Sequence, residues 1–89
     1  MERDGNLNIP GIRKLAERRS AGQLEACLFE TLKDGSSACV PGAATAVAVD
    51  MLAKAAYIRK KMDREGISVR EAMRALGAQI RQFRRQVKV

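Results

Sequence analysis

The chain has 89 residues and a net charge of +7, contains no histidine, and is 46% hydrophobic with only 3% aromatic residues. A chain of this length forms one domain that buries about 60–65% of its unfolded surface, and its small core is built from aliphatic residues, as in helical bundles. Without histidine it lacks the commonest general base and the commonest metal ligand, so we expect no enzyme, no metal and no cofactor.

The first eight residues are polar and lack hydrophobic periodicity. We therefore expect a disordered N-terminal arm over 1–8 and a single helical domain over 9–89. The first helix is predicted over about 9–18, because Pro10 suits a first helical turn and hydrophobic residues follow at a spacing of three to four.

A second helix is predicted over about 21–33. Ser20 and Gln23 have the spacing of a capping box, and Gly35 is placed to end the helix. Phe29 lies off the apolar face and is available to a neighbour. That face comprises Leu24, Cys27, Leu28, Thr31 and Leu32.

The segment GSSACVPG, residues 35–42, is the clear loop of the sequence. Cys27 lies on an apolar helix face and is expected to be a buried free thiol, whereas Cys39 lies in the loop. Cys39 is a candidate reactive thiol if a cation stabilises its thiolate, but the sequence assigns no such cation. Pairing of Cys39 with Cys27, or across a dimer, stays open.

A third helix is predicted over about 43–64, ending at Gly66. Its heptad-like seam of mostly small residues would let another helix approach closely. Leu52 and Tyr57 lie off this seam and, with Phe29, leave apolar surface for a second copy, so we expect a homodimer. The seam comprises Ala44, Ala48, Met51, Ala55, Ile58 and Met62.

A fourth helix is predicted over about 69–86, opened by a Ser68 and Glu71 capping box. Joined through the Gly66 turn, the last two helices are expected to form a long C-terminal antiparallel hairpin within an all-α, four-helix domain. The seam of the fourth helix comprises Val69, Met73, Leu76, Ile80, Phe83 and Val87.

Residues 64–89 hold seven Arg or Lys and two Glu, a net +5 of the total +7. Most of these cations fall on one stripe of the fourth helix. The stripe has three interpretations: a solvated face, a contact for phosphates, or a contact for an acidic protein or a membrane surface. A related line on the third helix, from Asp50 to Arg64, is expected to add a second, partly cationic ridge. The candidate contact residues are Arg70, Arg74, Arg81, Arg84, Arg85 and Lys88.

Residues 62–77 resemble a helix-turn-helix, although Met62 stands where that family has a small residue. The matching positions are Gly66, Ile67, Ser68, Ala72 and Ala75. The resemblance implies that the major groove would be contacted by Val69, Arg70, Met73 and Arg74.

A wider resemblance covers about 75 residues and includes IPGIRKLAE, QLEACL, LAKAAYIRKKM and GISVREAMRAL, followed by IR. These segments resemble a family of small bacterial proteins that share an IPxIRxLxE start and an AxRxLxxx(I/V)R end. The resemblance implies a bacterial origin and an all-helical fold, and it carries no activity.

No apolar run approaches the length of a membrane span, and the start lacks a signal-peptide layout, so we expect a cytoplasmic protein without a transmembrane segment. The sequence favours a non-enzymatic protein-interaction or oligomerisation module. The alternative is a nucleic-acid-binding protein that uses the basic stripe.

Overall fold

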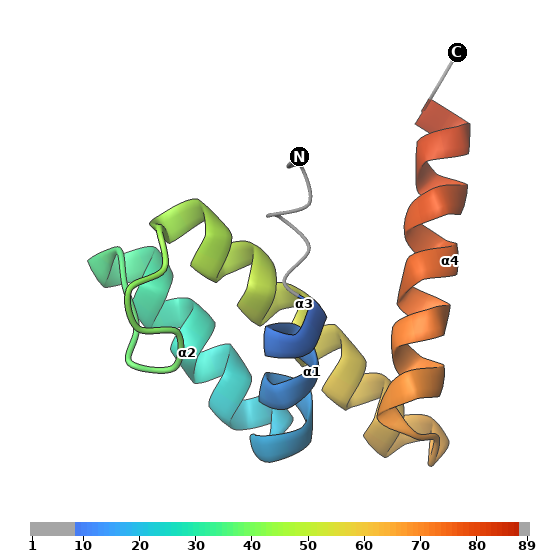
Figure 1. Cartoon of the computed structure of the whole chain (residues 1–89), viewed down its shortest axis with the longest axis horizontal. Coiled ribbons are helices and arrows are strands. Elements are labelled where there is room, and N and C mark those ends of the chain that lie inside the picture. The colour runs from blue at the N-terminus through green and yellow to red at the C-terminus, as the bar shows by residue number, and fades with distance from the viewer. Residues whose placement is uncertain (1–8, 88–89) are drawn as a thin grey trace.

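A computed structural model of the protein describes residues 9–87, with side chains through residue 82. Four helices and no strand lie within this described range (Figure 1), which confirms the predicted all-α class. The predicted arm, residues 1–8, lies outside it. Each helix begins and ends within two residues of its predicted bounds. The helices are α1 (Ile9–Arg18), α2 (Ala21–Asp34), α3 (Thr45–Glu65) and α4 (Val69–Val87).

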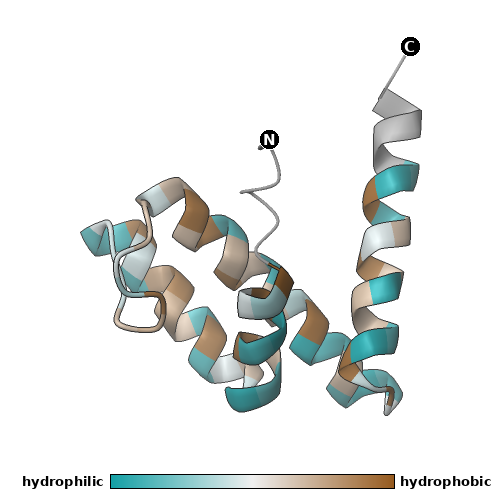
Figure 2. Ribbon diagram, viewed as in Figure 1, coloured by the Kyte–Doolittle hydropathy of each residue, from teal (hydrophilic) through white to brown (hydrophobic). Residues whose placement is uncertain are grey.

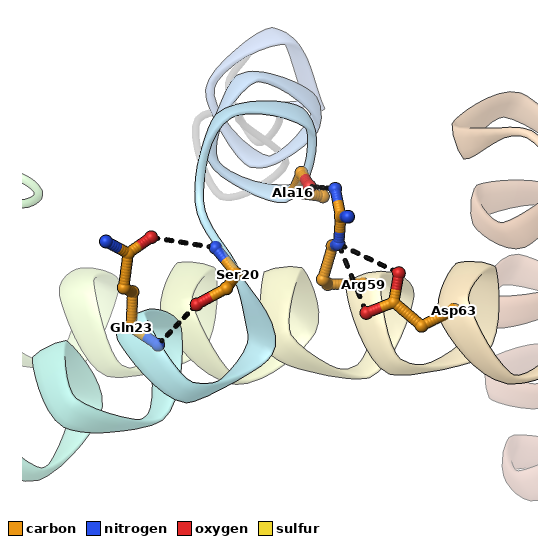
Figure 3. Close-up of polar contacts among 5 residues, drawn as sticks. All are labelled: Ala16, Ser20, Gln23, Arg59 and Asp63. Carbon is orange, nitrogen blue, oxygen red and sulfur yellow. Dashed lines mark hydrogen bonds and ion pairs between the residues drawn. The ribbon is translucent and has the colours of Figure 1, made fainter.

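Both predicted capping boxes are present. The Ser20 hydroxyl accepts a hydrogen bond from the Gln23 backbone N–H at 3.1 Å, and the Ser20 N–H donates to the Gln23 side chain at 2.9 Å (Figure 3). Ser68 and Glu71 make the same reciprocal pair at 3.1 and 3.2 Å. Each box satisfies two backbone N–H groups that a helix start leaves without partners.

Glycines end α2 and α3. Gly35 and Gly66 have φ angles of 87° and 65°, in the left-handed region that favours glycine. The backbone N–H of Gly35 donates to the Thr31 carbonyl, and that of Gly66 donates to the Met62 carbonyl, both at 2.8 Å. The Thr45 hydroxyl donates to the Gly35 carbonyl at 2.7 Å, so the first turn of α3 is fastened to the end of α2.

The packing of α3 differs from the expected arrangement. α2 runs antiparallel beside α3 over much of its length, and α1 crosses the pair (Figure 1). α4 meets α3 near the Gly66 turn and then diverges from it, so the predicted long hairpin of the last two helices is not confirmed. α3 contacts all three other helices, which explains why its small residues are buried on a wide face.

The core is aliphatic, as expected, but the burial of two leucines differs from the prediction. Leu52 is fully buried, because α3 is enclosed on several sides, and is not available to a partner. Leu32 is 63% exposed, because it lies about 100° round α2 from the buried Thr31. Phe29, at 72% exposed, lies on the surface as expected. The buried hydrophobic residues are Ile12, Leu15, Ala16, Leu24, Val40, Ala48, Met51, Leu52, Ala55, Ala56, Ile58, Val69 and Ala72.

Arg59 links α3 to the end of α1. Its Nη1 donates to the Ala16 carbonyl at 3.3 Å, and its Nε pairs with Asp63 at 3.2 Å (Figure 3). A cation at the last turn of a helix interacts favourably with the carbonyls there. No helix within residues 9–87 is long and apolar enough to cross a membrane.

Candidate functional site

The candidate site is the part of α4 that stands away from the other helices. Val69 and Ala72, in its first turn, are buried, and Leu76 packs partly against the core. Beyond that point Gln79 still contacts Tyr57 of α3, and α4 then continues away from the other helices in Figure 1. Figure 2 shows both hydrophobic and hydrophilic residues along the coloured part of α4. We call residues 77–87 the projecting half of α4.

A shallow hollow lies where α4 diverges from α3. It has a volume of about 280 Å³ and is lined by Tyr57, Leu76, Gln79 and Ile80. The Tyr57 hydroxyl donates a hydrogen bond to the Gln79 side-chain carbonyl, across the two helices. We call this feature the α3–α4 hollow.

The described arginines of the basic stripe are exposed. Arg70, Arg74 and Arg81 form no ion pair with any side chain in the part of the chain that is described. A Cβ placed on Gly77 would lie 3.7 Å from Nη1 of Arg81, so Arg81 reaches back over the gap that glycine leaves in the stripe. The remaining candidate contact residues fall outside the description, namely the side chains of Arg84 and Arg85, and Lys88.

The cations of the second ridge expected on α3 lie close to carboxylates, and Lys61 and Arg64 share Glu65, so the ridge is only partly cationic. All five cations of α3 lie within 4 Å of a carboxylate, most of them one helical turn away. The pKa of Glu65 lies below its ordinary value of 4.5, chiefly because Lys61 donates a hydrogen bond to it, with the charges of Lys61 and Arg64 adding to the effect. The ion pairs are Lys54–Asp50, Arg59–Asp63, Lys60–Glu25, Lys61–Glu65 and Arg64–Glu65.

The groove contacts implied by the helix-turn-helix resemblance are not all accessible. Val69 is 7% exposed, and Met73 packs against the core. These two side chains face the other helices, because the apolar seam of α4 docks there. Arg70 and Arg74 are exposed, so only half of the implied contact set is available on the surface.

Cys27 and Cys39 are joined by a disulfide, with their Cα atoms 6.3 Å apart. This corrects the expectation of a free thiol at Cys27, and it realises one of the two pairings that the sequence left open. Both residues are partly buried. The Cys27 carbonyl accepts from the Thr31 hydroxyl at 2.9 Å, and the Cys39 N–H donates to the Ser37 hydroxyl at 3.2 Å.

Sequence reasoning found no neighbouring cation for Cys39. The structure places Lys14 and Arg18 of α1, and Arg19 directly after it, around the same hollow as Cys39. These residues are about 20 positions distant in the sequence, and nothing in their spacing pointed to the loop.

Comparisons with protein-family models, with curated proteins and with solved structures found no match to this chain. The bacterial-family resemblance therefore rests on its sequence segments alone.

Proposed function

We propose that the chain is a non-enzymatic protein-interaction module that docks through α4, and that its first partner is a second copy of itself. The observation that carries this proposal is the α3–α4 hollow, where Leu76 and Ile80 remain partly exposed beside Tyr57. The apolar seam of α4 continues past this hollow to Phe83 and Val87 in the sequence. Because the apolar seam of α4 is longer than the part that α3 covers, it is suited to pairing with another helix.

A second copy is the occupant that this seam fits best. Two identical α4 helices related by a two-fold axis would set the same apolar positions against each other, as closed symmetric dimers do. The basic stripe lies about 100° round the helix from the seam, so the two sets of arginines need not face each other. A dimer would also enlarge the small core of an 89-residue chain.

Sedimentation equilibrium at roughly 100 μM, well above the range of ordinary specific association, tests this proposal. We expect the wild-type chain to be a dimer and Ile80→Gln to be a monomer with unchanged helicity. Leu32→Gln is the matched control, since Leu32 is also an exposed aliphatic residue but lies on α2. A monomeric wild type, or a Leu32→Gln variant that dissociates as readily as Ile80→Gln, would count against it.

An anionic partner is the second candidate, and the arginines of α4 favour it. Arg70, Arg74 and Arg81 have no carboxylate partner within the described part of the chain, in contrast to the cations of α3. Unneutralised cations along one helix face can contact phosphates and release counterions. This surface would suit nucleic acid, or an acidic protein.

Affinity for a random duplex between about 50 and 200 mM salt separates nucleic-acid binding from protein docking. If all five cations of the stripe contact phosphates, the logarithm of the affinity should fall against the logarithm of the salt concentration with a slope of about −4.5. Replacing Arg74 and Arg81 with Gln should make this slope shallower by about 2. The five cations are Arg70, Arg74, Arg81, Arg84 and Lys88. The same variant should retain wild-type helicity and oligomer size. A wild type without salt-dependent binding would leave the arginines as solvated residues or as contacts for an acidic protein.

A further inference from the structure

A second hollow lies between the end of α1 and the loop that follows α2. It has a volume of about 350 Å³ and is lined by Lys14, Leu15, Arg18, Arg19 and Cys39. Three of its five lining residues are cations, and none carries a carboxylate. We call it the Cys39 hollow.

The cations of this hollow have no carboxylate partner among the residues that the structure describes. Lys14, Arg18 and Arg19 form no ion pair with any described side chain, whereas Arg13 of α1 pairs with Glu17 at 3.5 Å. A common use of cations at a helix end is to bind the last carbonyls. One of the last carbonyls of α1, that of Ala16, already accepts a hydrogen bond from Arg59 of α3, so these three cations are not needed there.

The other half of the disulfide lies in a different electrostatic setting. Cys27 lines a separate hollow on α2, together with Ala26, Phe29 and three charged residues. Those charged residues are Glu30, Lys33 and Asp34, a net negative set. The two ends of one disulfide are therefore approached through surfaces of opposite charge.

We propose that the Cys39 hollow binds small anionic thiols and directs them to the sulfur of Cys39. Opposite charge raises the local concentration of such a thiol at Cys39, and the carboxylates beside Cys27 repel it. The cations also hold more of the bound thiol in its reactive thiolate form. Cys39 is then a site of thiolation, with a low-molecular-weight thiol carrying a carboxylate or sulfonate as the co-reactant.

The exchange step balances without any further oxidant. The thiolate sulfur of the small molecule forms a bond to Sγ of Cys39, the bond between Cys39 and Cys27 breaks, and its electron pair leaves on Sγ of Cys27 as a thiolate. The product is a mixed disulfide on Cys39. A second thiolate that attacks the small-molecule sulfur of this mixed disulfide releases the Cys39 thiolate and leaves a disulfide of two small thiols.

The test uses the full-length oxidised protein and three thiols of similar size. These are 2-mercaptoethanesulfonate (anionic), 2-mercaptoethanol (neutral) and cysteamine (cationic). The rate constant for opening the disulfide is measured at low ionic strength and corrected for the thiolate fraction and intrinsic nucleophilicity of each reagent. We expect the anionic thiol to react faster than the cationic one by about tenfold, and the difference to vanish in about 0.5 M salt.

Acid quenching and peptide mass analysis then locate the adduct, which we expect on Cys39. Replacing Lys14, Arg18 and Arg19 together with Gln should abolish the preference for the anionic thiol. The matched control replaces Lys54, Lys60 and Arg64 of α3 with Gln. This variant loses the same three positive charges, but away from the Cys39 hollow, and should keep the preference for the anionic thiol. If the triple variant fails to fold, the salt dependence of the rate difference in the wild-type protein still tests the proposal.

Three outcomes would overturn the proposal. The first is an equal or faster reaction of the neutral or cationic thiol at low salt. The second is an adduct found on Cys27. The third is a chain that cannot be oxidised to the intramolecular disulfide.

Discussion

Individual cations of this protein differ in whether a carboxylate lies within reach. On α3 the spacing of four residues between Lys61 and Glu65, and between Lys54 and Asp50, sets each pair on one helix face at 2.8 and 3.1 Å. On α1 and α4 no acid occupies the corresponding position for Arg18 or Arg74, and each keeps an unpaired charge within the described residues. Local spacing of acids therefore decides which basic residues remain available to a partner.

Lys61→Met should raise the pKa of Glu65 toward its ordinary value of 4.5, because Lys61 donates the hydrogen bond that lowers it. A carboxyl whose pKa falls on folding stabilises the native state above its unfolded pKa, and this contribution is lost as the pH falls through the folded pKa. NMR titration of the Glu65 side chain measures the shift. Lys54→Met, which removes a different pair, should leave it in place, and an unchanged Glu65 in Lys61→Met would contradict the assignment.

At the scale of elements, α4 is held to the rest of the protein by its first half. Val69 and Ala72 are buried there, and the capping box of Ser68 and Glu71 fixes the first turn that carries them. The projecting half, residues 77–87, extends beyond these contacts. A helix anchored at one end can present its free length to a partner without disturbing the core.

Ser68→Ala should lower the free energy of unfolding by about 1 kcal/mol, because the backbone N–H of Glu71 loses its side-chain acceptor. Denaturant unfolding followed by circular dichroism measures this loss. Ser36→Ala is the control, since Ser36 is exposed and makes no hydrogen bond within the described residues. Equal stability of the two variants would show that the cap does not fasten α4.

At the scale of the whole molecule, the loop between α2 and α3 is held by covalent and polar links. The disulfide joins α2 to the loop across a separation of 12 residues, and Ser37, which is buried, donates to Glu30 at 2.9 Å. The same loop supplies Val40 to the core and Cys39 to the hollow beside α1. Opening the disulfide would therefore loosen the loop and one wall of the Cys39 hollow together.

Replacing both cysteines with Ala should lower the free energy of unfolding by about 2–3 kcal/mol, since the cross-link restricts the unfolded chain over a short loop. Chemical denaturation of the oxidised protein, the reduced protein and the double variant measures the effect. The reduced protein and the variant should unfold at similar midpoints, both below the oxidised protein. Coincident midpoints for all three would indicate that the disulfide contributes nothing to stability.

The starts of α2 and α4 and the ends of α2 and α3 were predictable because their causes are local. A serine followed three residues later by Gln or Glu caps a helix start, and a glycine in the left-handed conformation ends one; Ser20, Ser68, Gly35 and Gly66 all act in this way. The exposure of Arg70, Arg74 and Arg81 was equally foreseeable, since a continuous helix fixes which positions share a face.

The sequence by itself determined the helical class, the helix bounds and the angular position of the arginines on α4. Only the tertiary structure decided that α3 packs most extensively with α2, that Leu52 is enclosed, and that Lys14, Arg18 and Arg19 gather beside Cys39. The physical reason is that an apolar seam specifies a helix face but not its partner, since burial of hydrophobic surface is non-directional. Partner choice depends on how the apolar faces of all four helices are buried together, and that choice creates the α3–α4 hollow and the Cys39 hollow.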